Sequence, residues 1–541
     1  MKFDIVVIGA GSAGAVLATR LSENPHCRVG LIEAGPDFGS LDQTPASVRR
    51  FDPIYIALGM EAGGSTTGIA AGSAYDWNLV AESTEEGRTM PVPRGKVTGG
   101  SSSVNGSVFT RHTTGDSQAW VAAGNDEWSY EKLLPYYRKL ETDRNFADEF
   151  HGTDGPMPVM RIMRDEWATS DHRFEDACVD LGFSTCDDHN RPDSTGVGPI
   201  PRNSIDGERM STARVYLSLA RARENLTIIP DAFVRRILFA GNRAVGVEVE
   251  GHGDAPIEAD QIVLAAGAIG TPHLLALSGI GPADQLSPLG IPVIADLPGV
   301  GHGLRDHPAI GLLWQRDPRD PSVSGATRGH PGVAAGANYL RFTARGSALP
   351  NDCRIFSPRT ESVPGQPDRD GFDSMYVGIY AATSSGRLTI ESADPHVQPR
   401  LRYGLLSDQE DKRRMAEIIA LAAEIGNHKS LRDVLGQLVD PGPEVLADPR
   451  ALERWMLHNV RTSHHVSSTA RMGPAGDRHA VVDQYGRVYG VEGLRIADAS
   501  VFPDCPTHNP NLPTIMLAER MADFIKADSG DPAPHAAEER A

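Results

Sequence analysis

The stretch FDIVVIGAGSAG at residues 3–14 decides the fold class. Its first half is a nearly continuous apolar run, which is typical of a parallel strand buried on both faces. Three glycines follow in the spacing G-x-G-x-x-G, namely Gly9, Gly11 and Gly14, and apolar residues then recur at helical spacing. The stretch therefore predicts a strand, a tight glycine turn and a helix.

Each glycine has a separate physical role in this motif. Gly9 permits the tight turn, Gly11 lets the backbone approach a pyrophosphate, and Gly14 lets the helix pack closely on the strand. The helix N-terminus then presents free N–H groups and a positive dipole to the phosphates. A second strand, residues 28–32, ends at Glu33, 19 residues past the last glycine and close to the roughly 20 expected for an acid that binds ribose.

We therefore predict a bound dinucleotide. NAD and FAD use the same loop, so these residues alone leave the choice between them open. The sequence contains no second complete G-x-G-x-x-G, which disfavours a flavoprotein that also docks NAD(P)H on a separate Rossmann domain.

Composition excludes several other classes of protein. The chain has 541 residues, more than one hydrophobic core usually supports, so at least two domains are expected. Its 71 acidic and 52 basic residues give a net charge of -19, which argues against a nucleic-acid partner. The five cysteines are scattered without metal-ligand spacing, so we expect no metal site, no disulfide framework and a cytoplasmic location. No apolar run reaches the roughly 18 residues of a transmembrane segment.

Further strand patterns follow at residues 227–229, 246–249, 261–265 and 494–496. Between the last two, residues 311–457 change character, with Gly/Pro-rich interruptions and one strong helix. We expect Ser407 and Glu410 to form the capping box of that helix, and a single apolar face to carry Met415, Ile418, Ile419 and Ala422. The tail, residues 528–541, offers no apolar face and is expected to be disordered.

Four separated stretches resemble signature regions of the glucose-methanol-choline (GMC) oxidoreductases. They are GKVTGGSSSVNG at 95–106, GAIGTPHLLALSGIG at 267–281, HHVSSTARMG at 464–473 and NPNLPTIMLAERMADFI at 509–525. The overall resemblance is to soluble bacterial members, including choline-dehydrogenase-like and hydroxymethylfurfural-oxidase-like proteins. The alcohol that such a protein would oxidise is not readable from these stretches.

The resemblance implies an α/β fold (α+β overall) with two domains. A Rossmann-like FAD-binding domain would be assembled from residues 1–155, 200–310 and 458–541. A substrate-binding domain with an antiparallel sheet and helices would be formed by residues 156–199 and 311–457. Flavin N5 would take a hydride from the alcohol, and FAD would be noncovalent because Val104 stands where some family members carry a linking histidine.

The resemblance places the active-site histidine at His465 and its partner at Asn511. Histidine suits the role of base because its pKa lies near working pH. A neutral amide can bind the alcohol oxygen without competing for its proton. The residues expected to contact FAD are Gly9, Gly11, Ser12, Ala13, Gly14, Glu33, Ala34, Trp77, Val97, Gly99, Gly100, Asn105, Gly106, Ser107, Val108, Val234, Gly267, His464, Asp498, Ala499, Pro510, Asn511 and Leu512.

Several roles stay open at this point. His464 fits a position where its ring could stack on the flavin, but a structural role fits as well. Trp77 either aligns with an aromatic residue that borders the flavin or is a core residue. Asp498 either meets the cofactor or caps a turn. His508 either supports Asn511 from behind the site or has a structural role. Ser468 stands where the family usually has glycine.

Three functional hypotheses follow. The first is a GMC-type alcohol oxidoreductase acting on a small-molecule alcohol, with oxygen or another electron acceptor reoxidising the flavin. Ser463 and His464 put polar groups near the ring, which favours a dehydrogenase over an oxidase. The second is a hydroxynitrile lyase that keeps FAD, and the third is a redox-silent FAD-binding protein, which the presence of His465 and Asn511 disfavours.

Overall fold

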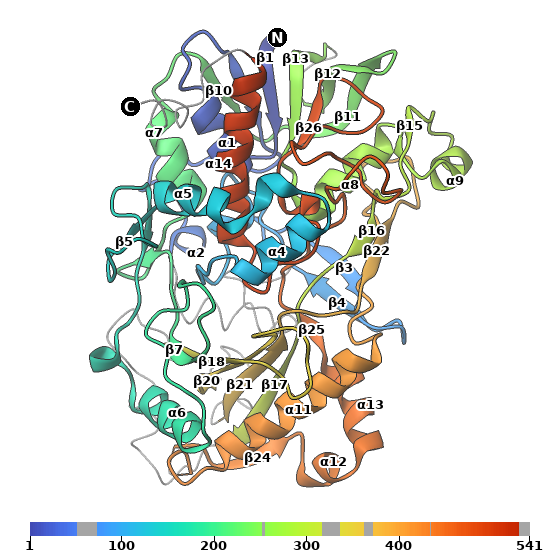
Figure 1. Ribbon diagram of the computed structural model, residues 1–541. Helices are drawn as coiled ribbons and strands as arrows, with labels where there is room; N and C mark the ends of the chain where they lie inside the picture. The colour runs from blue at the N-terminus through green and yellow to red at the C-terminus, as the bar shows by residue number, and fades with distance from the viewer. Residues whose placement is uncertain (51–72, 252–254, 316–335, 362–371, 433, 530–541) are drawn as a thin grey trace.

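The computed structural model describes residues 1–50, 73–251, 255–315, 336–361, 372–432 and 434–529. Two large sheets lie at opposite ends of the molecule in Figure 1. Among the described helices, none combines the length and apolarity that crossing a membrane requires.

The sheet nearer the chain termini has seven strands and contains the glycine-rich turn. Its strands β10, β2, β1, β13 and β26 run parallel, while β11 and β12 form an antiparallel hairpin that joins at β13. In order across the sheet they are β10 (Leu226–Ile229), β2 (Val29–Ile32), β1 (Lys2–Ile8), β13 (Ile257–Leu264), β12 (Arg243–Glu250) and β11 (Phe233–Ala240), with β26 (Leu494–Ile496) also paired to β13.

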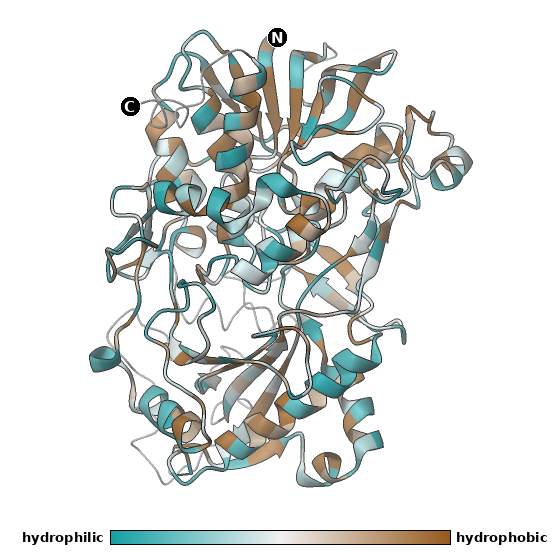
Figure 2. Ribbon diagram, in the orientation of Figure 1, coloured by the Kyte–Doolittle hydropathy of each residue, from teal (hydrophilic) through white to brown (hydrophobic). Residues whose placement is uncertain are grey.

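Every strand expected from the apolar patterns is present, which confirms the α/β fold class. β12 and β13 begin earlier than expected: Arg243 and Ala244 of β12 pair with β11, and Ile257 and Glu258 of β13 pair with β12. The central strands are buried along almost their whole length and mostly brown in Figure 2. They are covered by α1 (Gly14–Leu21) and by α14 (Asn511–Asp528), which pack against each other.

The glycine turn depends on contacts that leave no room for side chains. A Cβ on Gly14 would lie 1.8 Å from the carbonyl oxygen of Gly9, so the helix start touches the turn directly. A second glycine loop packs on the first: Gly100 has a φ of +52°, and a Cβ on it would lie 2.7 Å from the Cα of Gly11. The Gly99 N–H also donates to the carbonyl of Ala10 at 2.7 Å. The two loops therefore meet backbone to backbone.

The second large sheet is antiparallel and has eight strands. In order they are β24 (Gln437–Asp440), β17 (Pro308–Gln315), β21 (Phe372–Ile379), β19 (Cys353–Phe356), β18 (Asn338–Phe342) and β7 (Gly196–Pro199), with β20 (Arg359–Glu361) paired to β21 and β25 (Arg461–Thr462) paired to β17. Helix α11 (Gln409–Gly426) packs across it, and α6 (Thr169–Asp180) and α13 (Pro449–Asn459) lie beside α11.

Helix α11 has the apolar face that the sequence predicts, since Met415, Ile418, Ile419 and Ala422 are all buried. The expected capping box with Ser407 is wrong. The helix begins one residue later, and Asp408 is the N-cap, its carboxylate accepting a hydrogen bond from the backbone N–H of Glu410. Asp and Ser are nearly equivalent caps, so the pattern alone does not choose between adjacent candidates.

A smaller five-stranded sheet connects segments that are far apart in the sequence. Its order is β16 (His302–Leu304), β22 (Gly386–Thr389), β23 (Arg400–Arg402), β3 (Leu79–Glu82) and β4 (Thr89–Val92). Strands before residue 155 thus pair with strands after residue 311. Helix α5 (Tyr130–Leu140) packs against α14 and against α4 (Thr114–Ala122), and α8 (Gly267–Leu277) follows β13.

The C-terminal tail begins later than expected. Asp528 ends α14 and forms ion pairs with Arg487 and Arg495, and Ser529 is the C-cap. The expectation of disorder is therefore wrong for these two residues. Residues 530–541 lie outside the described residues.

The contact between the two glycine loops yields a stability prediction. The substitution Gly100→Ala places a methyl group against the Gly11 backbone at a positive φ, and we expect a cost of about 1–3 kcal/mol and a lower melting temperature. Gly476→Ala is the matched control, because nothing lies within 4 Å of its Cβ position. Equal melting temperatures for the two variants would contradict the close packing of the loops.

Candidate active site

Glu33 closes the dinucleotide site at the end of β2. Its buried carboxylate accepts hydrogen bonds from the backbone N–H groups of Ala10 and Gly35, both at 2.9 Å. Burial, only partly offset by these bonds and by a third from Ala34, raises the pKa of Glu33 to about 7. The Ala232 N–H donates to the Glu33 carbonyl at 2.8 Å, which brings the start of β11, with Val234, beside this acid.

The start of α14 meets the glycine loop. The Ser12 hydroxyl donates to Oδ1 of Asn511 at 2.8 Å, and the residues joined lie 499 positions apart in the chain. Nδ2 of Asn511 is buried without a partner among the described residues. Helix α14 begins at Asn511, between Pro510 and the buried Leu512. Because Asn511 contacts the loop, the first N–H groups of α14, which have no partner within the helix, lie in the same region as the loop.

The second glycine loop ends in a turn that several side chains fix. Oδ1 of Asn105 accepts from the Ser107 N–H at 3.0 Å, and Ser107 has a φ of +55°. The Arg202 guanidinium donates to the Gly106 carbonyl, and Val108 forms a β-bridge with Arg202. Val97, buried next to the buried Val104, anchors the start of the same stretch. The hydroxyl of Ser107 is buried without a partner in the described chain.

His465 lies in a buried polar pair with Asn509. Its Nε2 is 3.0 Å from Nδ2 of Asn509, and its Nδ1 is 2.8 Å from Nδ1 of His307. Oδ1 of Asn509 accepts from the Arg354 guanidinium at 3.1 Å. Burial, and then the neighbouring His307 ring, holds the pKa of His465 well below its usual range, so the ring is neutral and one of its nitrogens keeps a lone pair.

The expected partner of His465, Asn511, is therefore wrong by two positions. The segment THNPN carries one asparagine in the coil before α14 and one at the first residue of α14, and the fold directs Asn509 at the histidine and Asn511 at Ser12. His508, between them, is fully buried with its Nδ1 on the Thr507 hydroxyl. A coil has no periodicity from which the direction of a side chain follows.

Asp306 holds the backbone around His465, and the sequence patterns missed it. Its Oδ1 accepts from the backbone N–H groups of His465 at 2.9 Å and of His307 at 2.7 Å, and its Oδ2 accepts from the Thr462 hydroxyl. Burial raises the pKa of Asp306 to about 6. Asp306 and His307 precede β17 and are distant from His465 in sequence, so only the tertiary fold relates them.

His464 is oriented by the same Thr462 hydroxyl, which accepts from its backbone N–H at 2.7 Å. It has a φ of +64°, an uncommon conformation for a non-glycine residue. Both of its ring nitrogens are buried without a hydrogen-bond partner in the described part of the chain. Burial, with the nearby Arg94 cation, lowers the pKa of His464 to about 3.

Asp498 serves as a cap. Its carboxylate accepts from the Ser500 N–H at 2.8 Å at the start of the short helix η7 (Ala499–Val501), and also from the Gly267 N–H at 2.9 Å and the Thr271 hydroxyl at 2.6 Å. The Ala499 carbonyl accepts from the N–H of Ser468, whose φ of +66° explains the glycine that the family usually has there.

Trp77 is a surface residue. Its side chain is 37% exposed, with the Lys96 ammonium 5.1 Å from its ring centre and the Phe233 ring 6.2 Å away. Since Phe233 begins β11, these contacts associate Trp77 with the Glu33 end of the site, not with His465. The expected role of a core tryptophan is therefore wrong, and the expected place at the border of the flavin stays a prediction.

The residues present fit an FAD cofactor. Unpartnered buried polar atoms belong to Asn511, His464 and Ser107, and Gly267, at a φ of +79°, has nothing within 4 Å of its Cβ position. Gly11 likewise has no atom closer than 3.9 Å to its Cβ position. Buried polar groups normally have partners, and a cofactor bound beside these residues would supply them.

Comparison with known proteins agrees with this interpretation. The family model described as GMC oxidoreductase matches residues 3–309 with its N-terminal part and residues 382–518 with its C-terminal part. A GMC-type oxidoreductase of Rhodococcus erythropolis is 36% identical, over 97% of this chain and 98% of its own length. An oxygen-dependent choline dehydrogenase of Klebsiella pneumoniae is 36% identical over 97% of this chain and 96% of its own length. The solved structure of pyridoxine 4-oxidase from Mesorbium loti superposes with a TM-score of 0.83 at 30% identity. The match covers 96% of this chain and 98% of that chain.

The fold and this site define an FAD-dependent oxidoreductase that acts on CH–OH donors. The chain belongs to the GMC oxidoreductase family. The relatives lend no support to the lyase alternative.

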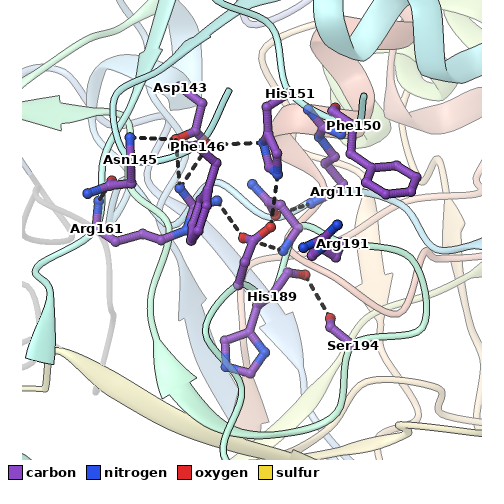
Figure 3. Close-up of polar contacts among 12 residues, drawn as sticks. Arg111, Asp143, Asn145, Phe146, Phe150, His151, Arg161, His189, Arg191 and Ser194 are labelled. Carbon is purple, nitrogen blue, oxygen red and sulfur yellow. Dashed lines mark hydrogen bonds and ion pairs between the residues drawn. The ribbon is translucent and has the colours of Figure 1, made fainter. Parts of the chain in front are cut away.

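A second buried polar cluster resembles a metal site but is neutralised by arginines (Figure 3). Glu141, Asp143 and His151 each offer a ligand atom, all within 4.8 Å of one another. Arg161 pairs with Asp143 at 2.8 Å, and Arg111 pairs with Glu141. Arg161 also pairs with Asp188 at 2.6 Å, and His151 contacts Asp188 at 2.9 Å, Asp143 at 3.2 Å and Glu141 at 3.4 Å. Three cations thus balance three carboxylates without a metal ion.

This cluster predicts how stability depends on pH. Burial alone would lower the pKa of His151, but the carboxylates of Asp143, Asp188 and Glu141 outweigh it and raise that pKa to about 10. A raised pKa means that the stabilisation is complete below the unfolded value near 6.5 and is lost as pH rises through about 10. We expect His151→Gln to lower the melting temperature most near pH 6 to 7 and progressively less toward pH 10.

The exposed His26→Gln is the control for this series, and it should leave the melting temperature unchanged at every pH. A difference between wild type and His151→Gln that stays constant from pH 6 to pH 10 would show that His151 is not a charged member of the cluster.

Proposed function

We propose that this enzyme oxidises a small-molecule alcohol with His465 as the base and Asn509 as the hydrogen-bond donor to the alcohol oxygen. The pairing of Nε2 of His465 with Nδ2 of Asn509 at 3.0 Å carries this proposal. An acceptor and a donor that meet at one point match the two needs of an alcohol hydroxyl, which gives up its proton and keeps its oxygen in place.

The other residues of the site have supporting roles in this proposal. When FAD is bound, flavin N5 supplies the hydride acceptor. Glu33 would hold the adenosine ribose, and the loop from Gly9 to Gly14 would hold the pyrophosphate. Asn511 and the start of α14 would bind the flavin end, with Ser12 keeping the asparagine in place. The cofactor is noncovalent in this proposal, because the buried Val104 has no group that could form a bond to it.

We further propose that the seven-stranded sheet forms the cofactor-binding unit and the eight-stranded sheet the substrate-binding unit. Strand β25 pairs with β17, so the second unit would extend a few residues beyond position 457. The five cysteines all lie among the described residues and form no disulfide, which supports a cytoplasmic location.

The first test of this proposal exposes the purified holoenzyme to alcohols without oxygen while flavin absorbance is recorded. The panel includes choline and pyridoxine, because relatives are named for these compounds. We expect at least one alcohol to bleach the flavin. Because Ser463 and His464 put polar groups by the ring, we expect recovery in oxygen to be slow and an artificial electron acceptor to be faster. Release of cyanide and an aldehyde from a hydroxynitrile without bleaching would contradict an oxidoreductase.

The second test separates the two asparagines. We expect His465→Ala to slow flavin reduction by about 10²–10⁴-fold, which is the usual contribution of a general base. Asn509→Ala should slow it by about 10²–10³-fold, the usual cost of removing one donor to a developing oxyanion. Asn511→Ala should chiefly weaken FAD retention, measured by flavin content after gel filtration.

Rates in this comparison are expressed per bound flavin, so that loss of cofactor is not counted as loss of chemistry. A larger rate loss in Asn511→Ala than in Asn509→Ala would contradict the assignment of Asn509. Full activity of His465→Ala would contradict the assigned base.

A further inference from the structure

The polar groups behind His465 form a chain of hydrogen bonds with a single consistent direction. It starts at Arg354, whose guanidinium has donors only. Its Nη1 donates to Oδ1 of Asn509 at 3.1 Å and its Nη2 to the Thr507 carbonyl at 2.9 Å. The Arg354 side chain is fully buried, and its guanidinium carbon lies 3.9 Å from the ring centre of Tyr380. This anchoring fixes which end of the Asn509 amide faces His465.

Because the amide oxygen of Asn509 faces Arg354, its NH₂ group faces His465 and donates to Nε2 at 3.0 Å. Nε2 must therefore be the bare nitrogen of the neutral ring, and the hydrogen must lie on Nδ1. The opposite tautomer would bring two N–H groups against each other and would leave no lone pair for a substrate proton.

The chain continues beyond His465 in the same direction. The Nδ1–H of His465 has an acceptor in Nδ1 of His307 at 2.8 Å, so the hydrogen of His307 lies on its Nε2. That nitrogen is 3.2 Å from the Cys505 sulfur, and the Cys505 thiol lies 3.6 Å from the His465 carbonyl. Burial, with the nearby Arg354 cation, lowers the pKa of His307 to about 3, so its Nδ1 keeps a free lone pair.

We infer that His307, backed by Cys505, is a positioning residue that acts with Asn509 to fix the tautomer of His465, so that Nε2 carries no hydrogen and its lone pair, which accepts from Asn509 in this structure, can take a substrate proton. The inference rests on the proposed function of His465 as the base. In the proposed reaction the alcohol proton would move to Nε2, bound FAD would supply the acceptor for the C–H hydride, and His465 would become an imidazolium whose Nδ1–H remains bonded to His307. A neutral imidazole acceptor orients the base without the charge that a carboxylate would add.

Two His307 variants test this inference. In His307→Asn the amide oxygen can replace Nδ1 as acceptor, whereas His307→Leu keeps apolar volume and removes the acceptor. Nitrogen-15 NMR of histidine-labelled oxidised holoenzyme reports which ring nitrogen of His465 carries hydrogen, and the resonance is assigned by its loss in His465→Gln. We expect an Nδ1–H tautomer in wild type and in His307→Asn, and an Nε2–H or mixed tautomer in His307→Leu.

Flavin reduction by the alcohol found active should be slower in His307→Leu by about 10- to 10⁴-fold, the upper figure being the cost of a wrong tautomer in a serine protease triad. Substrate affinity should change little, and His307→Asn should recover most of the rate. The inference is overturned if His307→Leu keeps the Nδ1–H tautomer at His465, or if the Asn and Leu variants lose the same rate.

Cys505, at the other end of the hydrogen-bond chain from Arg354, provides the same test if His307→Leu does not fold. Cys505→Ser keeps an acceptor for His307 and should preserve the tautomer and the rate, whereas Cys505→Ala should weaken both. Equal behaviour of these two variants would also overturn the inference. The NMR measurement needs no substrate, so an alcohol panel that never bleaches the flavin would refute the proposed function and leave the tautomer result to be judged separately.

Discussion

The backbone contact between two glycine loops is the constraint on which the rest of the site depends. Gly14 touches Gly9 within the first loop, and Gly100 touches Gly11 from the second, at distances that exclude even a methyl group. The hydrogen bond from Ser12 to Asn511 then brings the last helix to the same point. Segments from the start, the first fifth and the end of the chain converge there, so the base and the cofactor loop are positioned by one junction.

Burial governs the chemistry of the side chains at this junction. His307, His464 and His465 are all neutral because a charged ring would be costly in so dry an environment. The Asp306 carboxylate, which touches the backbone of His307 and His465, accepts from N–H groups and a hydroxyl instead of pairing with a ring. The site thereby keeps a basic nitrogen without a fixed counter-ion, which suits removal of a hydroxyl proton in concert with hydride loss.

Periodic patterns predicted the parts of the fold that are themselves periodic. The strand, turn and helix at residues 3–14, the other strands of the first sheet and the buried face of α11 follow from apolar spacing and glycine chemistry. Non-periodic parts were not predictable in the same way. Asn509 and Asn511 lie two residues apart where a coil leads into α14, and only the packing of α14 decides which of them meets His465.

Other errors have the same origin. Asp306, His307 and Arg354 reach His465 through tertiary packing, and no local pattern relates positions so far apart. Trp77 is aromatic and lies near a glycine-rich stretch, but its neighbours at the surface, Lys96 and Phe233, come from other segments. Resemblance to a family located the site to within a few residues, and side-chain geometry was needed to assign individual roles.

The most direct test of alcohol oxidation at His465 is the rate of anaerobic flavin reduction with an alcohol deuterated at its carbinol carbon. If His465 removes the hydroxyl proton while the carbon–hydrogen bond breaks, deuteration should slow flavin reduction by a primary isotope effect in wild type. The effect should persist in His465→Gln, at a much lower rate. Reduction at equal rates for the protonated and deuterated alcohols, or an unchanged rate in His465→Gln, would contradict the account.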